Sequence, residues 1–234
     1  PVSRYWDRIE RPEQLMVAVL NAMRVLTDPV ETGAVTLCLP QDTQAEAYDY
    51  PDYFLAKRIW HIDRRPLNQR PLHEAATLLS KAKNPLIIAG GGVHYSQAAD
   101  TLRDFAETFG IPVGETQAGK SAMSWKDSMS VGAIGVTGTS AANLIANDAD
   151  VVLVVGSRLQ DFTTASKQIF SPDVKLLHLN ISQYDALKMD SVALQADAKS
   201  GLESLKELLQ TGGYQTSLEY RERISQLQSE WNVE

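Results

Sequence analysis

One run of the sequence has the residue types and spacing of a loop that holds nucleotide phosphates. Residues 114–121 read GETQAGKS and match the pattern G-x-x-x-x-G-K-[ST] at every fixed position, directly after a short apolar run at residues 111–113. In such loops backbone amides surround the phosphates, the lysine (here Lys120) reaches the terminal phosphate, and the hydroxyl (here Ser121) binds magnesium. Residues 122–127 lack the apolar face of the helix that should follow. A stand-alone nucleotide-binding protein that uses residues 114–121 therefore stays an alternative.

A second run partly matches the glycine fingerprint of dinucleotide sites. Gly90-Gly91-Gly92-Val93-His94-Tyr95 follows an apolar run, and Glu115 lies about one strand later, where an acid can hold a ribose. The last glycine of the fingerprint allows a helix to pack closely on its strand, and here Tyr95 takes its place. The sequence therefore argues against a standard nicotinamide site.

The elements that must position these loops alternate between apolar strands and amphipathic helices. From residue 71 onward, apolar runs at residues 86–89, 151–155 and 174–179 are typical of buried parallel strands. Apolar residues at helical spacing predict helices between and after them, for example over residues 96–109 and 199–209. This alternation predicts an α/β fold with a doubly wound parallel sheet.

Glycines and small polar residues gather where the predicted strands end. In a doubly wound sheet, ligands bind beyond the carboxyl ends of the strands, and glycines allow backbone amides to approach a phosphate. The alternative is that these glycines only turn tight corners between strands and helices. The candidate residues of a nucleotide-like cleft are Gly90, Gly91, Gly92, Gly138, Thr139, Gly156, Ser157 and Arg158.

Charge and composition exclude several classes of function. The chain has 234 residues, with 22 Lys and Arg against 29 Asp and Glu, and its net charge of −7 argues against nucleic-acid or membrane partners. Cys38 is the single cysteine, so neither an intrachain disulfide nor a thiolate metal cluster can form. We expect no metal site, because ligand spacing is absent among the four histidines, His61, His73, His94 and His178. We expect a cytoplasmic protein, since the sequence shows neither a signal peptide nor an apolar run near the roughly 20 residues of a membrane helix.

Taken together, three stretches resemble the Rossmann-like middle domain of the thiamine-diphosphate enzymes of the acetolactate synthase group. They are residues 110–120 (GIPVGETQAGK), 135–143 (GVTGTSAAN) and 149–159 (ADVVLVVGSRL). Residues 1–4 and 33–42 look like parts of the pyrimidine-binding domain of the same group. The resemblance therefore covers nearly the whole chain.

Within this group, four short runs resemble hydrolases that open a trihydroxycyclohexane-1,2-dione to 5-deoxy-glucuronate in myo-inositol catabolism. They read YWDR (5–8), CLPQD (38–42), AYDYP (47–51) and TQAGK (116–120). The same region of an acetolactate synthase-like enzyme is the alternative.

Three departures from the synthases argue against that alternative and against bound FAD. Phe162 replaces an arginine that holds the second keto acid in the synthases, and Ala118 replaces a methionine against the flavin. Asn180 replaces an acidic residue after the next strand. Arg158 does match an arginine that contacts flavin in the synthases, which favours a nucleotide-shaped cleft.

The resemblance implies thiamine diphosphate and Mg²⁺ in a larger parent enzyme, with their ligands outside this chain. The sequence contains no Gly-Asp-Gly segment of the kind that binds magnesium and diphosphate in the family. We therefore expect a central fragment that carries no catalytic residue and is inactive alone. Gln117 and Lys120 are candidates for the substrate entrance of the parent.

The resemblance also implies a domain order and an assembly. Residues 1–45 would be the C-terminal part of the truncated pyrimidine-binding domain, 46–70 a linker and 71–212 a structural, dimerising middle domain. Residues 213–234 would form the helix that connects to a missing diphosphate-binding domain. We expect the parent to act on a small molecule as a homodimer or homotetramer.

Overall fold

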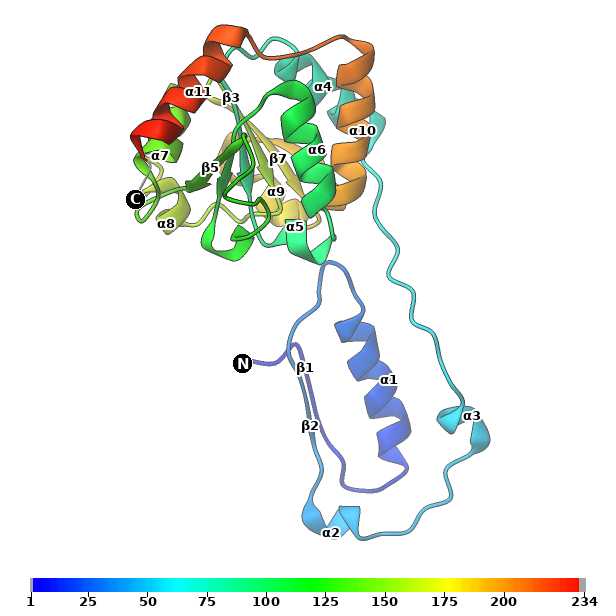
Figure 1. Ribbon diagram of the computed structural model, residues 1–234. Coiled ribbons are helices and arrows are strands. Elements are labelled where there is room, and N and C mark those ends of the chain that lie inside the picture. The colour runs from blue at the N-terminus through cyan, green and yellow to red at the C-terminus, as the bar shows by residue number, and fades with distance from the viewer. Residues whose placement is uncertain (1, 232–234) are drawn as a thin grey trace. The chain divides into compact units, whose positions relative to one another are not determined.

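The computed structural model describes residues 2–231 of the chain (Figure 1). The chain divides into two compact units, Pro1–Asp63 and Arg64–Glu234. Within residues 2–231, no helix combines the length and the apolar character needed to cross a membrane.

The first unit is built on a two-stranded parallel sheet. Strands β1 (Tyr5–Arg8) and β2 (Val35–Cys38) pair from Tyr5↔Val35 to Arg8↔Cys38, and helix α1 (Gln14–Leu26) connects them. The helix packs on the strands and buries Ala18 and Ala22. Two short helices follow, α2 (Gln41–Gln44) and α3 (Asp52–Leu55). Strand β1 was not among the predicted elements, because its four residues are two aromatic side chains followed by two charged ones.

One of the aromatic residues that follow β2, Tyr50, contacts the chain just before α1. The hydroxyl of Tyr50 donates a hydrogen bond to the carbonyl oxygen of Pro12 at 2.9 Å. The ring of Tyr50 packs against Tyr48 and Phe54, with centroid distances of 4.9 and 5.3 Å. This segment is therefore attached to the first unit by its aromatic side chains.

The second unit is a six-stranded parallel sheet, which confirms the predicted doubly wound α/β fold. Its strand order is β5-β4-β3-β6-β7-β8. The chain starts in the middle at β3, adds two strands on one side, and returns to the other side of β3 with β6. The strands are β3 (Pro85–Ala89), β4 (Val113–Glu115), β5 (Ser130–Ala133), β6 (Val151–Val155), β7 (Lys175–Asn180) and β8 (Val192–Gln195).

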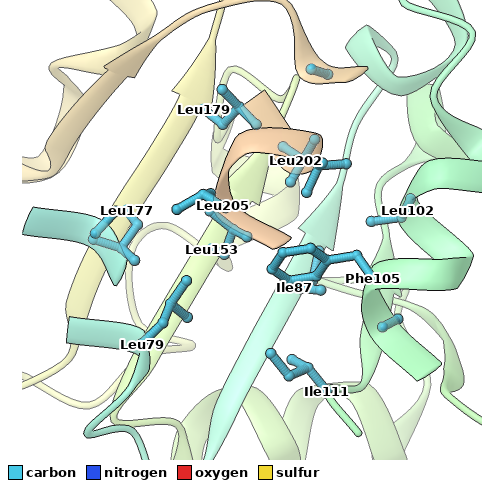
Figure 2. Packing of buried hydrophobic residues seen from close by; sticks show 14 of the residues in the cluster. Leu79, Ile87, Leu102, Phe105, Ile111, Leu153, Leu177, Leu179, Leu202 and Leu205 are labelled. Carbon is cyan, nitrogen blue, oxygen red and sulfur yellow. The ribbon is translucent and has the colours of Figure 1, made fainter. Parts of the chain in front are cut away.

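Helices cover both faces of this sheet, because the central strands carry apolar side chains on each side. Helices α4 (Gln69–Leu79), α6 (Ala99–Phe109) and α10 (Ala198–Thr211) pack on the face that Ile87, Leu153 and Leu177 occupy (Figure 2). Helices α7 (Ser140–Asp148) and α11 (Leu218–Glu230) cover the opposite face. Short elements occupy the loops, namely α5 (Gly92–Tyr95), η1 (Gln117–Gly119), α8 (Asp161–Thr164), α9 (Gln183–Ala186) and η2 (Lys188–Asp190).

Helix α11 packs tightly on the second face and on the edge of the sheet. The Tyr220 hydroxyl donates to the carbonyl oxygen of Pro85 at 2.9 Å. The side-chain amide of Gln228 donates to the carbonyl oxygens of Ser128 (2.9 Å) and Ser130 (2.7 Å). Side-chain donors thus occupy carbonyl groups next to and within the outer strand β5.

We predict that Leu153→Ala lowers the free energy of unfolding by about 3 kcal/mol, because Leu153 is fully buried in the central strand β6 and its removal leaves a cavity. The matched control is Leu144→Ala on α7, whose side chain is 49% exposed, and we expect a change of about 0.5 kcal/mol or less. Urea titration followed by circular dichroism measures both. Equal losses in the two variants would contradict this description of the core.

Candidate functional site

The loops after β3 and β6 meet backbone to backbone at the switch point of the sheet. The Gly92 amide donates to the carbonyl oxygen of Gly156 at 2.9 Å. A Cβ atom on Gly90 would lie 2.4 Å from that same oxygen, and one on Gly92 would lie 2.5 Å from the Cα atom of Gly156. Gly156 also has a φ of +62°, which L side chains rarely adopt. Glycine is therefore required on both sides of this contact.

A third loop joins the same contact from β4. A Cβ atom on Gly119 would lie 2.1 Å from the carbonyl oxygen of Ala89, and one on Gly91 would lie 3.3 Å from the Cβ atom of Ala118. We call Gly90, Gly91, Gly92, Gly119 and Gly156 the glycine seam. The seam lies between the carboxyl ends of β3 and β6, where doubly wound sheets bind dinucleotides.

Residues 114–121 do not form the phosphate-binding loop that their pattern suggests. The Gly119 amide donates to the carbonyl oxygen of Thr116 at 3.0 Å and lies 3.1 Å from its hydroxyl. The Glu115 carboxylate accepts a hydrogen bond from the Met123 amide at 2.8 Å, so it braces this loop. Among the described residues, no α-helix begins between η1 and α7. The helix terminus that a nucleotide phosphate needs is therefore missing, and the stand-alone nucleotide-binding alternative loses its support.

Two further cleft candidates help to start helix α7. The hydroxyl of Thr139 accepts a hydrogen bond from the Ala142 amide at 3.0 Å and donates to the carbonyl oxygen of Val131 at 2.7 Å. A Cβ atom on Gly138 would lie 2.7 Å from the carbonyl oxygen of Ala133. These contacts account for a small residue at 138 and a hydroxyl at 139 without a ligand.

The remaining cleft candidates are on the loop after β6. The Ser157 hydroxyl accepts a hydrogen bond from the Leu159 amide at 3.2 Å, and the Ser157 carbonyl oxygen accepts one from the Asn180 side chain at 3.0 Å. Arg158 is exposed, and its carbonyl oxygen accepts a hydrogen bond from Lys188 at 3.0 Å. A ligand role for these residues stays a prediction.

Beside Arg158 the surface has an open hollow of about 540 Å³. Leu159, Lys167 and Met189 have positive φ angles of 44°, 68° and 58°, a conformation that is uncommon outside glycine. The hollow could not be predicted from the sequence, because its lining residues come from two separate segments, 159–167 and 188–189, that have no common pattern. Its lining residues are Leu159, Gln160, Asp161, Phe162, Lys167, Lys188 and Met189.

His178 is a fully buried titratable group beneath the loop after β6. Its Nε2 atom lies 2.6 Å from the Ser157 carbonyl oxygen, and within residues 2–231 its Nδ1 atom has no hydrogen-bond partner. Burial lowers the pKa of His178 below its ordinary value of 6.5, and the hydrogen bond to Ser157 opposes this effect only in part. The ring is therefore neutral near pH 7.

The predicted entrance residues Gln117 and Lys120 are exposed at the carboxyl edge of the sheet. They flank Ala118 and Gly119, which pack against the loop after β3. The carbonyl oxygen of Lys120 lies 3.0 Å from Nε2 of His94, which belongs to α5. The backbone that carries both side chains is thus fixed, while the side chains remain accessible.

We predict that Gly90→Ala destabilises the second unit by about 2 kcal/mol or more, because the new methyl group meets backbone that cannot move aside. Gly212→Ala is the matched control, since the nearest atom to its Cβ lies at 3.5 Å and its φ is −77°. Thermal unfolding compares the two variants. A Gly90→Ala protein as stable as the control would show that the seam is looser than described.

We predict that the protein loses stability as the pH falls below about 6.5, in part through His178. Because the folded-state pKa is lowered, the unfolded chain binds more protons in this range, so stability is fully present above 6.5 and declines toward the folded pKa. His178→Gln removes this titration. The unfolding free energy of the variant, measured from about pH 7.5 to pH 5, should fall less steeply than that of the unaltered protein. Parallel curves would refute the role of His178.

Comparisons with known proteins agree with this architecture. The family described as thiamine pyrophosphate enzyme, central domain, matches residues 72–208, which lie in the second unit. A trihydroxycyclohexane-1,2-dione hydrolase from Clostridium tetani is 52% identical over 234 residues, and the hydrolase of that name from Bacillus thuringiensis is 51% identical over 234 residues. One from Clostridium botulinum is 50% identical over 235 residues. These alignments cover 100% of the chain and 36% of each relative, so the chain spans about a third of their length.

The family match assigns the second unit to one group of proteins, and the strand order is consistent with it. The family match runs from the first turns of α4 to α10 and includes all six strands of the large sheet. The chain belongs to the thiamine pyrophosphate enzymes, as a member of their central-domain family.

Proposed function

We propose that the chain is the central region of a thiamine-diphosphate-dependent hydrolase that opens a trihydroxycyclohexane-1,2-dione to 5-deoxy-glucuronate in myo-inositol catabolism. One observation carries the proposal. An identity of 50 to 52% with relatives named as this hydrolase extends over the whole chain, whereas the family match covers only residues 72–208. The first unit therefore shares in the likeness.

The residues of this chain do not fit the cofactor. Within residues 2–231, no group of three or more His, Cys, Asp or Glu side chains could hold a metal ion. The glycine seam is filled by its own backbone, so it offers no cradle for a diphosphate. We therefore propose that thiamine diphosphate and Mg²⁺ bind to residues outside this chain, and that the chain has no catalytic residue. The same closed seam favours a domain without FAD.

The role that we propose for the chain is to set the spacing of the parts that bind the cofactor. In this proposal residues 71–212 are the middle domain, and residues 213–234 lead to the diphosphate-binding domain. Residues 1–45 are the end of the pyrimidine-binding domain, joined by the linker 46–70. The parent enzyme would act on its small-molecule substrate as a homodimer or homotetramer.

The exposed apolar surface of the first unit supports its assignment as part of a larger domain. Helix α1 is largely apolar, yet only Ala18 and Ala22 are buried and Val17 is 64% exposed. Trp6 on β1 is 58% exposed. Parallel sheets normally have both faces covered, and two strands alone are marginally stable. These features are expected of a unit that packs against further strands and helices.

We predict that the complete parent enzyme, supplied with thiamine diphosphate and magnesium, consumes the dione and releases the deoxy-sugar acid. The 234-residue chain under the same conditions should show no turnover. Chromatography of the product measures both. Formation of acetolactate from pyruvate, with the dione left intact, would favour the synthase instead and reject the proposal.

The same assay tests the entrance residues. Lys120→Met in the parent should lower kcat/KM for the dione by about tenfold, because an exposed cation at the proposed substrate entrance attracts and orients a polar substrate. Lys175→Met is the control, since Lys175 is an exposed lysine at the start of β7, at the opposite end of the sheet. Equal kcat/KM values in the two variants would remove Lys120 from the entrance and leave the rest of the proposal unchanged.

A further inference from the structure

The first residues of the second unit are bonded to the start of helix α10. Nη1 of Arg64 lies 3.1 and 3.0 Å from the two carboxylate oxygens of Asp197. The carbonyl oxygen of Arg65 accepts hydrogen bonds from the Asp197 amide at 2.9 Å and from the Ser200 hydroxyl at 2.8 Å. Both residues that begin this unit are thus attached to the same helix terminus.

Asp197 is held in place by hydrogen bonds that do not involve Arg64. Its Oδ1 atom caps α10 by accepting hydrogen bonds from the amides of Lys199 (3.0 Å) and Ser200 (3.2 Å). Its side chain is only 13% exposed, and the N-terminus of a helix favours a negative charge. A carboxylate that is already ordered costs little further entropy when it binds a guanidinium. The ion pair Arg4–Glu31 differs, because both of its side chains are more than half exposed.

The chain just before Arg64 is not anchored by buried side chains. Residues 55–66 are all exposed, and the first buried residue that follows is Leu67. Helix α4 begins only at Gln69. The bonds of Arg64 and Arg65 are therefore the first that fix the incoming chain to the second unit.

We propose that Arg64 and Asp197 form a clamp that sets where the connecting segment joins the second unit, and that this clamp opens without unfolding the unit. Asp197 is the positioning residue, and Arg64 is the group that it captures. When the clamp opens, the unattached connecting segment lengthens from residue 63 to Leu67. The residues before it can then take a wider range of positions and orientations. This inference depends only on contacts within the second unit and stands apart from the proposed activity.

The test uses variants that break the clamp but keep the helix cap. Asp197→Asn retains a side-chain oxygen that caps α10, because asparagine is as good at this position as aspartate. We expect trypsin to cleave the Arg64–Arg65 bond about tenfold faster in this variant, since loss of a charge-assisted pair shifts the opening equilibrium by roughly that factor. The thermal midpoint should stay close to that of the unaltered chain.

A second variant reports on the other half of the clamp. In Arg64→Ala, the Asp197 amide, which donates to Arg65, should exchange its hydrogen about tenfold faster, and Arg64→Lys should restore part of the protection. The control is Asp104→Asn, which removes the negative charge that pairs with Lys206 on α10 and leaves the clamp intact. Its exchange and cleavage rates should match those of the unaltered chain.

Two results would overturn the inference. Unchanged cleavage in Asp197→Asn together with unchanged exchange in Arg64→Ala would show that the Arg64–Asp197 pair does not hold the segment, and that the backbone bonds of Arg65 and the burial of Leu67 are sufficient. A large fall in the thermal midpoint of both variants would show that these bonds belong to the global fold, so they could not open locally.

Discussion

The second unit depends on a direct backbone contact between the loops after β3 and β6, with no side chain between them. Strands β3 and β6 are neighbours at the switch point, and their loops leave toward opposite faces of the sheet. The loops pass each other because Gly90, Gly92 and Gly156 have no Cβ atoms, and a hydrogen bond of 2.9 Å joins them. Helix α5 and the 3-10 turn η1 take their positions from this contact. The glycines that resemble a ligand cradle thus fix how the loops after β3 and β6 pass each other.

The strands of the large sheet could be predicted because they are buried on both faces. Such burial produces continuous apolar runs, as in Val151–Val155, and the structure has strands at each of the three long runs. Strand β1 could not be found this way, because Trp6 and Arg8 point to an exposed face and break the apolar pattern. A continuous apolar run therefore identifies a strand that is buried on both faces and misses a short strand such as β1.

The functions of the strand-end loops could not be predicted from residue types alone. A glycine that lets a phosphate approach and a glycine that lets another loop approach satisfy the same steric requirement, so Gly90 and Gly156 give one signal for both. Glu115 stands at the spacing of a ribose ligand, but its carboxylate braces the Met123 amide. The hollow that Phe162 lines could not be predicted, because Lys167 and Met189 take their places around it through positive φ angles, which residue type does not indicate.

Helix α11 has a consequence for where this domain can be cut. The family match ends at residue 208, ten residues before the helix begins at Leu218. Yet Tyr220, Ile224 and Leu227 belong to the apolar cluster of the second face, and Gln228 occupies carbonyl groups at the rim of the sheet. A protein trimmed to residues 72–208 would expose the apolar residues that α11 covers and the unpaired carbonyl groups of the edge strand β5. Both features favour self-association. The segment needed for a stable, monomeric domain therefore extends past residue 208 to include α11, beyond the residues that the family model matches.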